Sequence, residues 1–157
     1  MVVPGDIPDT QAYVAFSPST GGYKLDVPEG WARSQAGAAA TLTDKFNAIQ
    51  VEIRPAVAAP TTASAQSTDV PALAAAVPCF TIGTVSEVSR KAGAAVLITY
   101  RADSPANAVT GKVVRQDVER YEFWHAGQEA VITLSAPQGS DNVDPWRRVT
   151  NSFTWAP

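Results

Sequence analysis

The sequence predicts an α+β domain with a mostly antiparallel sheet, and two observations carry this prediction. Short runs in which apolar and polar residues alternate are separated by turn residues, which is the pattern of antiparallel strands. A helical pattern occurs once between these runs and once at the end of the chain. The 157 residues, 45% of them hydrophobic, suffice for one domain with a substantial core but are few for two.

The N-terminal part predicts a β-hairpin. The run Tyr13–Phe16 leads into the turn residues of 17–22, and apolar and charged side chains then alternate over 23–27. This period of two places alternate side chains on opposite faces of a strand. The preceding residues 1–12 are polar and contain proline, so we expect them to be an N-terminal tether to a single domain over 13–157.

Two further strands are expected to follow the hairpin. In the first, at 40–46, apolar side chains up to Phe46 share one face, and Asp44 is the one polar exception. In the second, at 49–54, apolar residues alternate with polar ones. Pro55 ends this strand because proline has no N–H to donate to the ladder.

The middle of the chain predicts a long loop and a short helix. Residues 56–68 are almost entirely alanine, proline, threonine, serine and glutamine, a low-complexity composition with nothing to bury. Thr68 or Asp69 is expected to cap a short helix over 72–77. Pro78 should end that helix because it disfavours helical backbone at the preceding residue.

The second half predicts more sheet. After a strand through 85–88, the run 94–100 is apolar on both faces and is expected to be a covered, central strand. A long strand should then run over 112–124. Apolar Val118 and Tyr121 stand at positions of opposite parity in it, which predicts a β-bulge between them.

The chain should end with a strand and its best-marked helix. A turn at 126–127 is followed by a strand through 132–134. Asp144 is expected to cap the final helix, and Pro145 suits its first position. Apolar residues then fall at i, i+3 and i+7, which gives one face for docking on a sheet. They are Trp146, Val149 and Phe153.

Charge and cysteine content exclude several classes of function. The formal net charge is -3 and no segment is strongly basic, so neither a nucleic-acid footprint nor a polybasic membrane-binding segment is present. No apolar run reaches the length of about 18 residues that a transmembrane helix needs. The single cysteine, Cys79, excludes an internal disulfide and is expected to be a small buried apolar residue rather than a reactive thiol.

No catalytic residue, metal site or cofactor is predicted. His125 is the only histidine and has no evident nucleophile or orienting group, so a solvated side chain at a strand end is expected. The acidic loop 139–144 offers few side-chain oxygens for calcium and is interpreted as a turn with a helix cap. Glu119 and Glu122 are an odd number of positions apart, so they should face opposite sides of a strand.

The aromatic residues leave one binding hypothesis open. Trp31, Tyr121 and Trp124, with His125 beside them, are candidate binding residues because large aromatic side chains can line a ligand groove. The alternative is that these side chains pack in the core or at its rim. A cavity lined by them would favour a ligand carrier, whereas a filled core would favour a protein adaptor.

Three stretches together resemble a known family. They are residues 22–31 (GYKLDVPEGW), 43–47 (TDKFN) and 139–146 (GSDNVDPW), the last with 152–155 (SFTW) behind it. They resemble PsbP-like proteins, notably actinobacterial PsbP-like lipoproteins. The resemblance implies an α/β/α sandwich with a central, mostly antiparallel twisted sheet and a C-terminal helix packed on it. It also implies a non-enzymatic role, and makes 13–157 a single PsbP-like domain.

These inferences lead to a functional hypothesis. The chain is expected to be a non-catalytic cell-envelope binding or adaptor module, the soluble part of a lipoprotein whose leader and lipid anchor are absent here. Its partner would be an unknown protein or small ligand, not nucleic acid. A cytoplasmic location is the alternative. The alternative function is a carrier of a small apolar or amphipathic ligand held between sheet and helix, and a hydrolase using His125 ranks third.

Overall fold

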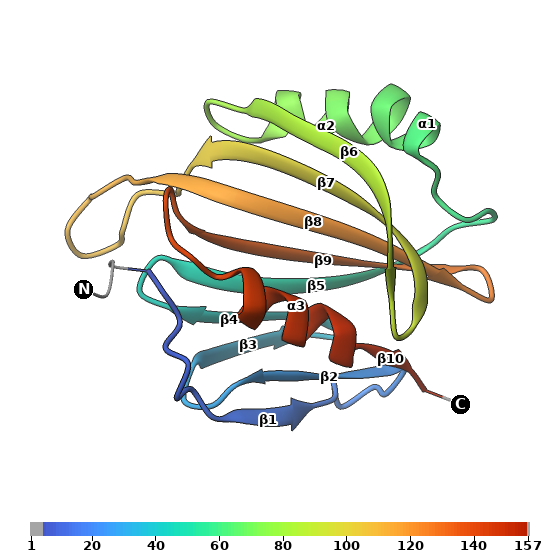
Figure 1. Ribbon diagram of the computed structural model, residues 1–157, viewed down its shortest axis with the longest axis horizontal. Coiled ribbons are helices and arrows are strands. Elements are labelled where there is room, and N and C mark those ends of the chain that lie inside the picture. Colours follow the sequence, from blue (N-terminus) through green and yellow to red (C-terminus); the bar gives the residue numbers. More distant parts are fainter. Residues whose placement is uncertain (1–4, 157) are drawn as a thin grey trace.

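Within residues 5–156, which this computed structural model describes, two antiparallel sheets form the centre of the fold (Figure 1). The large sheet contains β3 (Ala32–Ala36), β4 (Ala39–Asp44), β5 (Asn47–Pro55), β9 (Gln128–Pro137), β8 (Arg115–His125), β7 (Gly93–Asp103) and β6 (Thr81–Arg90), in that spatial order. The small sheet contains β1 (Tyr13–Phe16), β2 (Tyr23–Pro28) and β10 (Thr154–Trp155). Neighbouring strands pair in antiparallel register, which confirms the predicted α+β class.

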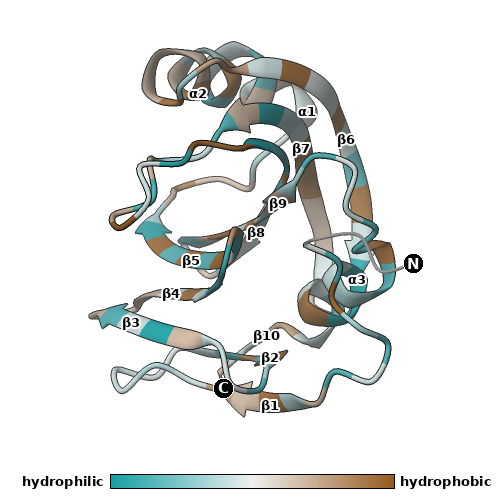
Figure 2. Ribbon diagram, turned by 90° about the vertical axis from the view of Figure 1, so that its left-hand side faces the viewer, coloured by the Kyte–Doolittle hydropathy of each residue, from teal (hydrophilic) through white to brown (hydrophobic). Residues whose placement is uncertain are grey.

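Helices cover both faces of the large sheet. On one face lies α3 (Val143–Ser152), together with the small sheet. On the other lies a continuous helical segment at 62–76, made of α1 (Thr62–Ser64), the π-helical turn η1 (Ala65–Asp69) and α2 (Val70–Ala76). Figure 2 shows α2 and α3 on opposite sides of the curved sheet. The implied α/β/α sandwich is therefore confirmed.

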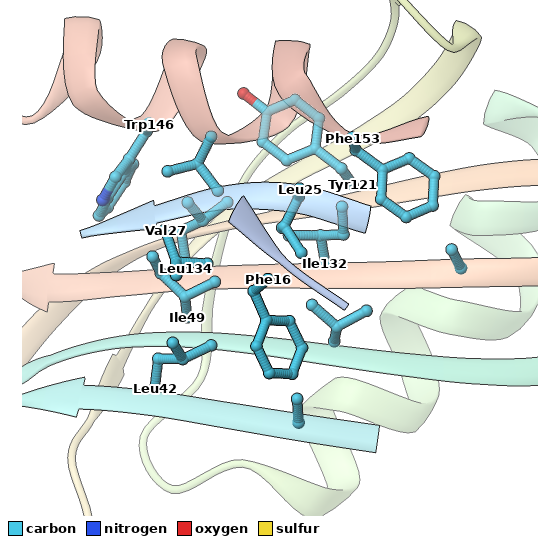
Figure 3. Close-up of a cluster of buried hydrophobic side chains, with 14 of the residues drawn as sticks. Phe16, Leu25, Val27, Leu42, Ile49, Tyr121, Ile132, Leu134, Trp146 and Phe153 are labelled. Atoms are coloured by element: carbon cyan, nitrogen blue, oxygen red, sulfur yellow. The ribbon is translucent and has the colours of Figure 1, made fainter. Parts of the chain in front are cut away.

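Each face of the sheet has its own hydrophobic core. The main core lies between the sheet, α3 and the small sheet (Figure 3). Its largest members are Phe16, Tyr23, Leu25, Trp31, Leu42, Ile49, Tyr121, Phe123, Ile132, Leu134, Trp146 and Phe153. The second core lies under the helical segment 62–76 and is smaller. Its buried members are Ala65, Val96, Ile98, Tyr100, Ala102 and Val118.

The predicted hairpin and the strands β4 and β5 are confirmed, with one correction to their ends. The β1–β2 pairing joins Tyr13 to Pro28 and Phe16 to Leu25. Phe46 does not continue β4 as predicted, because the strand ends at the exposed Asp44 and Phe46 lies in the two-residue turn to β5. The other residue of that turn, Lys45, has a positive φ of 56°.

Strand β8 carries no bulge, which corrects the prediction for 118–121. Its pairing with β7 and β9 runs in unbroken register from end to end. Val118 and Tyr121 are both buried because the strand is covered on both faces: Val118 belongs to the second core and Tyr121 to the main core. The register shift lies instead in β6, between Ile82 and Val85.

The segment predicted as a loop over 56–68 becomes helical at its second half. Thr61 caps the helix through its hydroxyl, which accepts from the backbone N–H of Ser64 at 3.0 Å, and the Ser64 hydroxyl accepts from the Thr61 N–H at 2.9 Å. Ala65 is completely buried under this helix. Val77 adopts an extended backbone conformation before Pro78, so the predicted end of the helix is confirmed.

The cap of α3 differs from the prediction. The helix begins at Val143 with Asn142 at the N-cap position, so Asp144 lies in its first turn and Pro145 is its third residue. The Asn142 side chain instead binds the N-terminal segment, because its Oδ1 accepts from the Ile7 N–H at 2.7 Å. Ile7 is buried in the main core, within the range predicted as a tether; residues 1–4 of that range lie outside the described residues.

Phe153, just after α3, is the aromatic centre of the main core. Its ring lies 5.1 Å from that of Phe123, 5.8 Å from that of Tyr23 and 5.3 Å from that of Trp155. These distances are typical of favourable aromatic pairs. Phe153 therefore joins α3, the small sheet and β8, and Figure 3 shows it reaching from the end of the helix toward the strands.

We expect Phe153→Ala to lower the free energy of unfolding by about 3–5 kcal/mol, because it removes a completely buried ring and leaves a cavity. Urea denaturation followed by circular dichroism measures this loss. Val109→Ala, at a side chain that is 93% exposed, is the control and should change stability by less than about 0.5 kcal/mol. Equal effects of the two substitutions would contradict a central role for Phe153.

Candidate functional site

Two of the candidate binding residues are buried in the main core. Trp31 is 8% exposed and Tyr121 is 2% exposed. The Tyr121 hydroxyl donates to Glu119 Oε1 at 2.7 Å and accepts from Arg90 Nη2 at 3.1 Å. Burial raises the pKa of Tyr121 to about 12, with the Glu119 carboxylate acting in the same direction. Both aromatic side chains therefore pack the interior of the protein.

The other two candidates lie at the far end of β8 and on opposite faces of it. Trp124 is 36% exposed and its indole N–H donates to the Ala56 carbonyl at 2.9 Å, so it packs under the loop that begins there. His125 is exposed and its ring lies 5.8 Å from that of Trp155. The four candidates thus do not converge on one pocket.

Cys79 is exposed, so the prediction of a buried cysteine was wrong. The chain turns sharply there, with a φ of 54°, and the Arg115 Nη1 donates to the Cys79 carbonyl at 2.6 Å. A hydrogen bond to the Asp103 carboxylate raises the pKa of the thiol, and only Arg115 opposes this. Arg115 and His125 mark opposite ends of β8, about 33 Å apart at the rise of a strand, so Cys79 and His125 are not partners.

Residues 5–156 contain neither a membrane-spanning helix nor a metal-binding group of side chains. Within that range no helix is long and apolar enough to cross a membrane. The same residues contain no group of three or more histidine, cysteine, aspartate or glutamate side chains placed to hold a metal ion.

An open groove follows the part of the large sheet that the helical segment 62–76 leaves uncovered; we call it the sheet groove. Its volume is about 420 Å³. Its floor consists of uncharged hydrogen-bonding side chains from β4, β5, β8 and β9. They are Thr41, Thr43, Gln50, Gln116, Thr133 and Ser135. The end of α2, with Ala76, Val77 and Pro78, forms one apolar wall, and Phe46 and Pro105 stand at other sides.

The floor of the sheet groove is available for hydrogen bonding. Gln116 donates to the Phe46 carbonyl at 2.9 Å. Among the described residues, the hydroxyls of the floor have no hydrogen-bond partner within the protein. Charge is confined to Lys45 and Asp103. An uncharged ligand with both hydroxyl or amide groups and apolar parts fits this combination best.

A second groove of about 480 Å³ lies beside the start of α3, on the opposite face of the sheet. Its charged groups are already paired: Asp117 Oδ1 accepts from Arg101 Nε at 2.9 Å, and Glu119 accepts from Tyr121. Thr99, at its floor, accepts from the Thr84 N–H. This groove therefore offers fewer free hydrogen-bonding groups than the sheet groove.

Five charged residues meet between the sheet and the helical segment, and we call them the buried charge cluster: Arg54, Asp69, Arg120, Glu122 and Glu129. Arg54 binds Glu129 through two hydrogen bonds of 2.9 and 3.1 Å. Arg120 Nε donates to Glu122 Oε2 at 3.0 Å. Glu122 is completely buried, and desolvation raises its pKa to about 7, with Asp69 acting in the same direction and Arg120 against it.

The sequence predicted one feature of this cluster correctly and did not predict another. Glu119 and Glu122 do face opposite sides of β8, as their spacing predicts. The place of Asp69 in this cluster was not predicted, because Asp69 was expected only as a candidate cap for a short helix over 72–77. The only sequence signal was an acidic residue at the centre of a strand in which both parities are apolar.

The chain was compared with known proteins in sequence and structure. No known family profile matches it, and no curated protein matches it in sequence. Solved structures of similar fold include the cyanobacterial PsbP protein of Synechocystis, with 14% identity and a TM-score of 0.60 over 97% of this chain and 98% of that one. The Ran-binding protein Mog1p of Saccharomyces cerevisiae has 10% identity and a TM-score of 0.57 over 92% of this chain and 95% of that one.

A mycobacterial envelope protein also shares the fold. LpqN of Mycobacterium tuberculosis, involved in cell envelope biogenesis, has 14% identity and a TM-score of 0.51 over 99% of this chain and 90% of that one. A Bacteroides thetaiotaomicron structure matches with 9% identity and a TM-score of 0.58, and this chain spans 50% of its length. The chain therefore has a PsbP-like fold, and the likeness extends to the fold alone.

The thiol of Cys79 offers a test of the local electrostatics. We expect Asp103→Asn to speed alkylation of Cys79 by iodoacetamide at pH 7, by about two- to tenfold, because removing the carboxylate lowers the pKa of the thiol. Alkylation rates measured by mass spectrometry report this change. Asp117→Asn, which breaks a different surface ion pair, is the control. An unchanged or slower reaction in Asp103→Asn would contradict the assignment.

Proposed function

We propose that this protein is a non-catalytic binding module of the cell envelope and that the sheet groove is its binding surface. The observation that carries the proposal is the uncharged, hydrogen-bonding floor of that groove beside the apolar end of α2. Such a surface suits recognition, because polar groups fix the orientation of a ligand while apolar walls supply contact area.

The buried position of the aromatic candidates favours an adaptor that works through its surface. Trp31 and Tyr121 are packed in the main core, and no cavity described above is lined by them. A filled core has no room for an enclosed ligand. The partner is therefore proposed to be a protein or ligand that lies on the sheet groove rather than inside the domain.

One observation keeps the carrier function as a second candidate. The sheet groove lies between the sheet and the end of α2, which is where a carrier of a small amphipathic ligand would hold its cargo. Its volume of about 420 Å³ is within the usual range for small-molecule sites, about 300–1,000 Å³. A hydrolase using His125 has no support among residues 5–156: the contact of its ring is with Trp155, it has no hydrogen bond to a serine, and Cys79 lies near the opposite end of β8.

The proposed location is extracytoplasmic. Support comes from the resemblance of the sequence to PsbP-like lipoproteins and from the shared fold with LpqN, a protein involved in cell envelope biogenesis. In the native precursor, a lipid at a preceding cysteine would tether the domain to the membrane.

Native mass spectrometry tests the binding function. We expect protein purified from its own host to carry a bound ligand or subunit, and Thr133→Arg to lose it, since the larger charged side chain fills the floor of the groove. The intensity ratio of bound to free protein is the measurement, and a loss of tenfold or more, ~1.4 kcal/mol in binding free energy, is expected.

The matched control is Thr20→Arg, the same chemical change in the exposed turn between β1 and β2. This variant should retain the bound species. Binding that survives in Thr133→Arg, or disappears equally in both variants, would remove the sheet groove as the binding surface. A small molecule as the bound species would favour the carrier, and a protein subunit the adaptor.

The location has its own test. We expect the product of the full-length gene, expressed in its host, to fractionate with membranes and to carry a lipid on an N-terminal cysteine, which intact-mass measurement detects. Replacing that cysteine with serine should release the protein from the membrane fraction. A full-length product that is unmodified and stays in the cytoplasm would overturn the envelope assignment.

A further inference from the structure

The starting observation is an unpaired oxygen at the centre of the protein. The Glu122 side chain is 0% exposed. Its Oε2 accepts from Arg120 Nε at 3.0 Å and lies 4.0 Å from Arg54 Nη2. Its Oε1 is buried and has no hydrogen-bond partner among residues 5–156. Burying a carboxylate oxygen without a hydrogen-bond partner is energetically unfavourable. The arrangement therefore implies that a carboxyl group at this place carries a proton.

Asp69 is the group placed to share that proton. Its Oδ1 lies 3.5 Å from Arg54 Nη2, and the same nitrogen lies 4.0 Å from Glu122 Oε2, so the two carboxyl groups converge on one guanidinium. The Asp69 side chain is 15% exposed. Asp69 is the only ionisable residue of the helical segment 62–76, and it ends the π-helical turn η1. Such turns insert one extra residue and often occur at functional sites.

The positive and negative charges of the buried charge cluster sum to zero only if one of its carboxyl groups carries a proton. The buried charge cluster holds three carboxylates, from η1, β8 and β9, and two guanidiniums, from β5 and β8. On the same face of the sheet, Glu52 on β5 and Glu87 on β6 are exposed to solvent, and Tyr100 lies on β7. Fully ionised, the cluster would therefore carry one net negative charge next to a completely buried oxygen.

We propose that Glu122 and Asp69 share one proton and that this shared proton latches the helical segment 62–76 onto the second core. The protonated carboxyl donates to the other carboxylate, which gives Glu122 Oε1 a partner and cancels the excess charge. Loss of the proton leaves two negatively charged carboxylates close together, and the one on Glu122 is completely shielded from solvent. The raised pKa of Glu122, about 7, agrees with this arrangement.

Loss of the shared proton can release the helical segment, because few buried side chains attach it to the sheet. Ala65 is its one completely buried residue, and Val70 and Leu73 are only partly buried against the second core. Release of the segment would expose the apolar side chains beneath it, including Val96 and Ile98. The inference does not rest on the proposed binding function, since it concerns the attachment of the helix rather than any ligand.

The direction of the pH effect follows from linkage. A carboxyl with pKa about 7 in the latched state and an ordinary value of 4.5 when released binds its proton more tightly in the latched state. Latching is therefore strongest below pH 4.5, weakens as the pH rises from 4.5 to about 7, and levels off above that.

Hydrogen exchange measured by mass spectrometry on the full chain tests the latch. After correction for intrinsic exchange, we expect protection of residues 62–76 to fall by roughly tenfold or more between pH 5.5 and 8, because the Glu122 carboxyl binds its proton more tightly in the latched state. Glu122→Gln, which cannot ionise, should retain its protection at pH 8. The matched control Glu119→Gln, on the opposite face of the same strand, should behave as the wild-type protein.

A second measurement covers the case in which Glu122→Gln fails to fold. The carboxyl carbon of Glu122 in the wild-type protein, followed by NMR, should titrate near pH 7. A Glu122 midpoint below pH 5 would overturn the proposal. So would a Glu122→Gln protein whose helical segment keeps the pH dependence of the wild type.

Discussion

The constraint on which the structure depends is that one antiparallel sheet is buried on both faces by different parts of the chain. Strand β8 shows it most clearly, because Tyr121 and Phe123 enter the main core while Val118 and Glu122 point into the opposite layer. Alternate residues of a strand therefore serve two cores at once. Shifting the register by one residue would place Glu122 among the aromatic rings, so the pairing of β8 with its neighbours is strongly specified.

The two covering layers are attached with unequal strength. On one face, α3 contributes Trp146 and Val149 to the main core, and Phe153 follows at its end. On the other, the helical segment 62–76 contributes one small buried residue, Ala65, and depends on polar contacts at Asp69. It also covers only part of its face. The uncovered part becomes the sheet groove, so the features that suit binding gather on the weakly covered face.

The strands that can be predicted from the sequence are those in which apolar and polar residues alternate clearly. Strands β2 and β5 alternate clearly between apolar and polar residues and were expected, whereas β3, whose residues 32–36 are all exposed, carries no apolar pattern and was missed. The helix expected over 72–77 was found as part of α2, whereas the first part of the helical segment was not predicted, because it is polar and alanine-rich and Ala65 is its one completely buried residue. The convergence of Asp69 and Glu122 on Arg54 could not be predicted from the sequence, because it depends on strand register and on the extra residue of a π-helical turn.

The groove and the buried charge cluster act on the same element, and that links them. The end of α2 forms a wall of the sheet groove, while Asp69, one residue before α2 begins, belongs to the buried charge cluster. If a ligand needs this wall in its latched position, it binds the latched arrangement in preference to the released one. Linkage then requires reciprocity: such a ligand raises the affinity of the cluster for its proton by the same factor by which the proton raises the affinity for the ligand.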